Sequence, residues 1–184
     1  MENNKTLFTI AVFAENYVGL LNQLSIIFTR RCLNIESGIA SRSAIPGVHK
    51  MTFTCYSDRH TMEKVVKQIE KRVDVLKAFL YTDDELVFQE IALYKVPTAK
   101  LIDEPNLEHI IRKHNARILE ISRENTVIEK TGHSEETEAL FEELKHYDIR
   151  QFVRSGRVAV TKSPDELVDK FLAEQELRSK RIPD

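Results

Sequence analysis

An asparagine and a glycine lie where a strand-like run gives way to a helical pattern. Residues 6–14 are almost entirely apolar, and apolar residues recur at helical spacing from Leu20 onward. Asn16 and Gly19 fall between these two patterns. The first N–H groups of a helix are unpaired and lie at the positive end of its dipole, so they can hold a carboxylate, and a residue without a Cβ lets a small anion approach them. This stretch could therefore bind a small anionic ligand.

The same two residues also have a purely structural interpretation. We expect Gly19 in the first turn of the helix, where glycine costs up to about 1 kcal/mol relative to alanine. Its presence then reflects either tight packing of the strand against the helix or the close approach of a ligand. Asn16 is either an N-cap whose side-chain oxygen accepts a backbone hydrogen bond or an amide that faces a ligand. The residues alone leave both interpretations open.

No other residues have the spacing of a catalytic or metal site. The Gly-x-Gly-x-x-Gly, P-loop, His-Glu-x-x-His and Gly-x-Ser-x-Gly patterns do not occur, and 5 glycines offer little material for phosphate-binding loops. Cys32 and Cys55 have no metal-ligand spacing, and we expect two free thiols. His109 and His114 are five residues apart and do not share a helix face. We therefore expect a non-catalytic chain that carries no metal and no cofactor of its own.

Composition indicates an ordinary globular protein. The chain has 184 residues, 42% of them hydrophobic, which is enough for one medium domain or two small ones. Its formal net charge of −2 argues against a nucleic-acid partner. The N-terminus lacks the pattern of a secretory signal, and no apolar run approaches the roughly 20 residues of a membrane span. We expect a cytoplasmic protein with no membrane partner.

Alternating strand and helix patterns predict the order β-α-β-β-α-β in the first 84 residues. Strand-like runs cover residues 6–14, 33–41, 49–57 and 75–82. Helical spacing of apolar residues lies between the first and second runs, and again between the third and fourth. This order is that of the ferredoxin-like fold, a four-stranded antiparallel sheet with two helices on one face.

A similar order recurs in the second half. Strand-like runs cover residues 85–96, 116–122, 125–132 and 149–160, with helical patterns around Ile110 and Leu140. Beyond them, Ser163, Pro164 and Glu166 have the types that open a helix. The sequence thus predicts an α+β protein of two consecutive ferredoxin-like domains, residues 1–84 and residues 85–184 with a terminal helix.

RNA-recognition domains share this topology but not the sequence pattern. Their third strand carries stacking aromatic residues around a glycine, and HKMTFTCY, residues 49–56, lacks that glycine and that spacing. Together with the near-neutral charge, this excludes RNA binding as a prediction.

At the helix start the sequence resembles a known family, the small regulatory subunits of acetolactate synthase. ENYVGLLNQLSIIFTRRCLNIES, residues 15–37, is similar to the E-N-x-x-G-x-L…F-x-x-R-G-x-N-I-E-S block of that family, and PGVHKMTF resembles its P-G-x-x-x-M-T segment. The resemblance continues through VDVLKA, QEIALYKV, KTGH and RSGRVAV, so it covers roughly residues 6–160. The N-terminal half of these subunits is an ACT domain, and an ACT domain alone would not explain the segments of the second half.

The resemblance implies a regulatory role in branched-chain amino-acid biosynthesis. The chain would bind and activate a catalytic large subunit, which would carry thiamine diphosphate, Mg and FAD, and would mediate feedback inhibition by valine, leucine or isoleucine. Two N-terminal ACT domains would pair as a homodimer, with the effector held between the strand-to-helix loop of one chain and the facing elements of the other. The alternative is a free-standing ACT-type amino-acid sensor that regulates another enzyme or a transcription factor.

Carried onto this chain, the effector contacts are Asn16, Gly19 and Leu20 from the helix start, with Asn34 and Ile35 from the start of the second strand. Asn34 also has a structural interpretation, as a turn residue that caps the helix exit.

Two positions depart from the family pattern. Cys32 stands where the family usually has glycine at the end of the first helix, and a non-glycine residue in a left-handed cap costs about 1 kcal/mol. Tyr17–Val18 replaces a smaller pair or a proline before Gly19, which changes the mouth of the expected site.

Overall fold

The computed structural model describes residues 5–164 together with residues 168, 171 and 173. The chain forms two compact units: residues 1–87 with 159–184, and residues 88–158. The sequence-based division at residue 84 assigned everything beyond it to the second domain, whereas the described residues from Ala159 onward belong to the first unit. The rest of the predicted C-terminal helix, including Glu166, lies outside the described residues.

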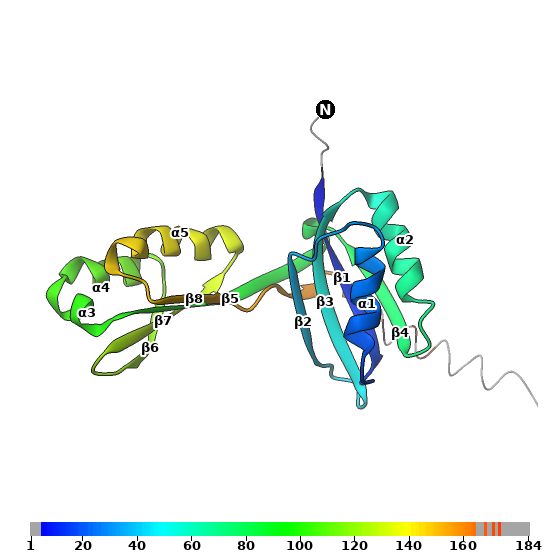
Figure 1. Cartoon of the computed structure of the whole chain (residues 1–184), viewed down its shortest axis with the longest axis horizontal. Coiled ribbons are helices and arrows are strands. Elements are labelled where there is room, and N and C mark those ends of the chain that lie inside the picture. The colour runs from blue at the N-terminus through cyan, green and yellow to red at the C-terminus, as the bar shows by residue number, and fades with distance from the viewer. Residues whose placement is uncertain (1–4, 165–167, 169–170, 172, 174–184) are drawn as a thin grey trace, which may run out of the picture. The chain divides into compact units, whose positions relative to one another are not determined.

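The first unit has the predicted ferredoxin-like fold. Its elements are β1 (Thr6–Glu15), α1 (Leu20–Thr29), β2 (Ser37–Arg42), β3 (Val48–Ser57), α2 (Arg59–Ile69) and β4 (Val75–Tyr81). The strands form an antiparallel sheet in the order β2-β3-β1-β4. Figure 1 shows α1 and α2 on the same face of this sheet.

The helices are held on that face by apolar side chains at helical spacing. Leu24 of α1 and Met62 of α2 are fully buried against β1 residues such as Ile10 and Val12. The helix α2 begins at Asp58, whose carboxylate accepts a hydrogen bond of 2.9 Å from the N–H of Thr61. That hydrogen bond lowers the pKa of Asp58. Because alternate residues of β1 point to opposite faces, Ala11 and Phe13 lie on the helix-free face.

The second unit repeats the topology. Its elements are β5 (Leu86–Pro97), α3 (Thr98–Asp103), α4 (Pro105–Lys113), β6 (Arg117–Ile121), β7 (Asn125–Gly132), α5 (Ser134–Leu144), the 3₁₀ turn η2 (Lys145–Tyr147) and β8 (Gln151–Arg154). The sheet order β6-β7-β5-β8 matches that of the first unit. Both predicted ferredoxin-like repeats are thus confirmed.

Two details of this half differ from the prediction. The short helix α3 has no apolar periodicity of its own, and the sequence did not reveal it. The predicted strand 149–160 is interrupted around Gly156, where φ is 80°, and forms β8 and β9 (Val158–Thr161), which both pair with β5. A 3₁₀ turn, η1 (Asp83–Glu85), precedes β5.

The core of the second unit includes a buried tyrosine. Tyr94 of β5 is fully buried, and its hydroxyl donates a hydrogen bond of 2.6 Å to the carbonyl of Thr137 in α5. Burial raises the pKa of this phenol. The bond satisfies the only polar group of the side chain and ties the strand to the helix that covers it.

The helices α1 and α4 end in the same left-handed turn. At the end of α1, Cys32 has a φ of 54°, its N–H donates to the carbonyl of Thr29 at 3.0 Å, and the N–H of Leu33 donates to that of Phe28 at 3.1 Å. This is the Schellman pattern. Asn115 has a φ of 50° and the same two bonds at the end of α4. Cys32 therefore keeps the cap geometry for which glycine is preferred.

Replacing Cys32 by glycine is expected to stabilise the chain by about 1 kcal/mol, because the Cβ of an L-residue is strained at this φ. Urea unfolding would measure the gain in the free energy of unfolding. Asn115→Gly is the matched control and should give a smaller gain, since asparagine tolerates the left-handed region better than cysteine. Equal or greater stability of wild type compared with Cys32→Gly would contradict the assignment of strain to this residue.

Candidate functional site

A cavity of about 130 Å³ lies at the start of α1 in the first unit. Three of the predicted effector residues, Asn16, Gly19 and Leu20, line it. The other lining residues come from the same loop and helix and from the neighbouring strands: Glu15, Tyr17, Leu21, Ala40, His49 and Met51. The strand-to-helix loop and the helix-covered face of β2 and β3 therefore form one concave site.

Gly19 lies one residue before the helix, not inside its first turn as predicted. It is the N-cap residue of α1, with a φ of 88°. A Cβ at this position would have no atom within 4 Å, so tight packing does not explain the glycine. The left-handed φ explains it, because only glycine adopts that conformation without strain. The open space beside it leaves the helix start accessible.

The start of α1 has backbone donors without side-chain partners. No side-chain hydrogen bond caps the helix at Gly19, and the first helical bond runs from the N–H of Gln23 to the carbonyl of Gly19 at 3.1 Å. The N–H of Leu20 donates to the carbonyl of Tyr17 at 3.3 Å, so the donors that remain at the helix start are those of Leu21 and Asn22. Asn16 is exposed, and its side chain forms no hydrogen bond with the part of the chain that the structure describes. The capping interpretation of Asn16 is therefore wrong, because the N-cap position belongs to Gly19. Its amide is available to a ligand.

His49 is a site residue that the sequence analysis missed. It lies on β3 opposite Ala14 of β1 and Arg42 of β2, two residues before Met51, and so it faces the same side as Met51. Its Nδ1 atom is buried and has no hydrogen-bond partner among the described residues. A buried nitrogen without a partner costs about 1–3 kcal/mol, and a ligand in the cavity could supply one. The alternation of side chains along β3, which places His49 on the same face as Met51, is the sequence signal that could have identified it.

Asn34 and Ile35 do not line this cavity in the chain itself. The prediction placed them at the start of the second strand, but pairing of β2 begins only at Ser37, opposite Thr54. The left-handed turn at Cys32 redirects the chain before that point. Asn34 is exposed, whereas Ile35 packs against the core between sheet and helices.

The lining of the cavity suits a zwitterion with an apolar side chain. The N–H groups of the helix start favour a carboxylate. Glu15 and the side-chain oxygen of Asn16 offer acceptors for an ammonium group at the same end. Leu20, Ala40 and Met51 form an apolar wall that favours an aliphatic group. Within the described residues, no group of three or more His, Cys, Asp or Glu could hold a metal ion.

Comparison with known proteins identifies related sequences over both units. The family described as "Small subunit of acetolactate synthase" matches residues 89–163, and the "AHAS small subunit-like ACT domain" matches residues 10–77. The acetolactate synthase small subunit of Bacillus subtilis is 35% identical over 156 residues, which cover 84% of this chain and 89% of that protein. The probable small subunit of Archaeoglobus fulgidus is 32% identical over 84% of this chain and 96% of its own length.

A solved structure agrees with these sequence relatives. The acetolactate synthase small subunit of Thermotoga maritima superposes with a TM-score of 0.77 and 26% identity, over 86% of this chain and 99% of that one. Among the described residues, no helix has the length and apolar character needed to cross a membrane. The matches cover both ferredoxin-like units and the loop that forms the cavity, so this chain belongs to the family of acetolactate synthase small subunits.

Proposed function

We propose that this chain binds the catalytic subunit of acetolactate synthase, raises its activity and lets a branched-chain amino acid inhibit it. Family membership supports the regulatory role. The observation that carries the effector assignment is the cavity at the start of α1, which combines uncapped helix N–H groups with an apolar wall. The reaction and its cofactors, thiamine diphosphate, Mg and FAD, belong to the catalytic subunit in this proposal.

The proposal gives the effector one orientation in the cavity. Its carboxylate lies at the N–H groups that begin α1, and its ammonium group lies toward Glu15 and Asn16. Its side chain contacts Ala40 and Met51. An aliphatic amino acid satisfies all three requirements, and valine is the effector that we propose first.

The proposal also includes a homodimer through the ACT unit. In this arrangement the exposed Asn34 of one protomer, together with the backbone at Ile35, reaches the effector bound at α1 of the other. The strands β2 and β4 are the edges of the four-stranded sheet. An edge strand leaves backbone N–H and C=O groups unpaired, and pairing with a second copy satisfies them.

The decisive experiment mixes the purified chain with its cognate catalytic subunit and follows acetolactate formation. The chain alone should be inactive, and increasing amounts of it should raise turnover by the catalytic subunit to a plateau. Valine should then reverse the activation, while light scattering should show a dimer or a larger species. Unchanged turnover across a wide range of added chain would refute the proposed function.

A further inference from the structure

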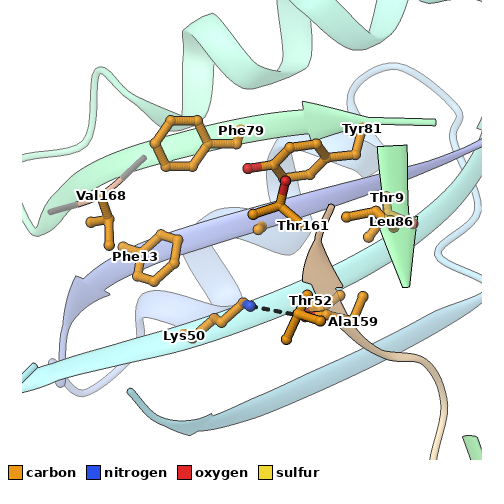
Figure 2. A pocket seen from close by; sticks show the side chains of 12 residues that line it. Thr9, Phe13, Lys50, Thr52, Phe79, Tyr81, Leu86, Ala159, Thr161 and Val168 are labelled. Carbon is orange, nitrogen blue, oxygen red and sulfur yellow. Dashed lines mark hydrogen bonds between the residues drawn. The ribbon is translucent and has the colours of Figure 1, made fainter. Parts of the chain in front are cut away.

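Residues 159–161 and Val168 of the same chain cover part of the helix-free face of the first sheet. Ala11 and Phe13 of β1 form an apolar cluster there with Val48 and Val168, and Val168 is only 1% exposed. Figure 2 shows Val168 beside Phe13, and Ala159 near Thr52. The space left under this segment is about 30 Å³, room for little more than one water molecule. We name the described residues 159–164 and 168 the returning segment.

Hydrogen bonds fix the beginning of the returning segment. The ammonium group of Lys50 on β3 donates to the carbonyl of Ala159 at 3.0 Å, which is the dashed line in Figure 2. The backbone N–H of Lys162 donates to the carbonyl of Glu85 at 2.9 Å, and its Nζ donates to that of Asp84 at 2.8 Å. Lys50 also lies 5.7 Å from the centre of the Phe13 ring. One end of the segment is therefore held by both β3 and the turn before β5.

The strand β3 connects this contact with the effector cavity. His49 and Met51 line the cavity, whereas Lys50 and Thr52 lie under the returning segment on the opposite face. Consecutive residues of a strand point to opposite faces, so the two sites share one backbone segment. β3 pairs with β1 on one side and β2 on the other, so its residues shift together rather than singly. A ligand that displaces β3 at His49 must also displace Lys50.

Ala159 is the residue at which the chain passes from the second unit back to the first. We propose that the hydrogen bond between Lys50 and Ala159 couples occupancy of the effector cavity to the conformation of this link. The inference rests on the proposed function, because it assumes that the cavity binds an amino acid. Lys50 is then a positioning residue, since it acts through Ala159 and does not touch the ligand.

Lys50→Met tests this coupling, because it removes the ammonium group and keeps an unbranched side chain of similar length. By calorimetry the variant chain should bind valine within about threefold of wild type. In the holoenzyme it should activate normally, but saturating valine should remove less than half as much activity as in wild type. Lys50→Arg should restore inhibition, because the guanidinium group also donates to a carbonyl. Lys64→Met, an exposed lysine of α2, is the matched control and should behave as wild type.

Hydrogen exchange of the wild-type chain supplies a second test that needs no variant. Valine should change the exchange rate of the Lys162 amide at least threefold, because that amide anchors the returning segment. Normal valine binding with unchanged exchange, or full inhibition of the Lys50→Met holoenzyme at saturating valine, would overturn the coupling alone. If wild type binds none of valine, leucine and isoleucine, the effector assignment fails and the coupling fails with it.

Discussion

Gly19→Asp is expected to bind valine at least tenfold more weakly than Gly19→Asn, a difference of about 1.4 kcal/mol. Aspartate and asparagine are nearly equal in size, and both tolerate a left-handed backbone better than most residues. The conformational cost at a φ of 88° is therefore similar in the two variants. What differs is a negative charge beside the helix N–H groups where the carboxylate of the effector lies. Two like charges 4 Å apart repel by about 1–4 kcal/mol, depending on the local dielectric constant.

Calorimetry on both variants, with the inhibition of the holoenzyme as a second readout, would measure this difference. Both variants should remain folded and should activate the catalytic subunit, because a Cβ at Gly19 meets no atom within 4 Å. The loss of up to about 1 kcal/mol of stability at the left-handed position should appear equally in both. Equal valine affinity of the two variants would show that the carboxylate does not bind at this helix end.

Val168→Asp should destabilise the first unit by about 2–4 kcal/mol. The side chain is 1% exposed against Phe13 and Val48, and burying a valine contributes about 1.5–3 kcal/mol. A carboxylate in the same place adds the cost of an unpaired buried charge. Detachment of the returning segment sets the upper limit of this cost, because the carboxylate then returns to water. Urea unfolding of the full chain would measure the loss, and proteolysis near the C-terminus should become faster.

Val158→Asp is the control for this substitution. Val158 begins β9 and is 57% exposed, so a carboxylate there stays in water. Its effect on stability should remain within about 0.5 kcal/mol, the usual range for surface substitutions. If Val168→Asp were as stable as Val158→Asp, the apolar contact of the returning segment would make no contribution to the fold.

The sequence predicted the features that depend on local periodicity. Leu24 and Met62 recur at helical spacing, and Met51 and Phe53 alternate with Thr52, so both ferredoxin-like repeats could be recognised. Asn16, Gly19 and Leu20 are neighbours in sequence and also line one cavity. Local patterns are sufficient where the fold brings together residues that are already close along the chain.

The features that the sequence did not predict depend on backbone geometry or on distant contacts. The left-handed φ of Gly19 moved the helix start by one residue, and no apolar pattern reports a φ angle. His49 joins the site only through the pairing of β3 with its neighbours. Val168 and Phe13 are in contact although most of the chain separates them in sequence. A valine in an expected helix gives no sign that it packs against so distant a strand.

The first unit is built from two separate stretches of the chain, and this determines the order in which its parts are synthesised. The ribosome makes residues 88–158, about 70 residues, after the first sheet is complete and before Ala159 emerges. At about 5–20 residues per second this takes roughly 4–14 s. During that interval Phe13 and Phe79 face water without the returning segment, so the nascent first unit exposes an apolar surface. The second unit is continuous in sequence and can finish folding within this interval, before the first unit is closed.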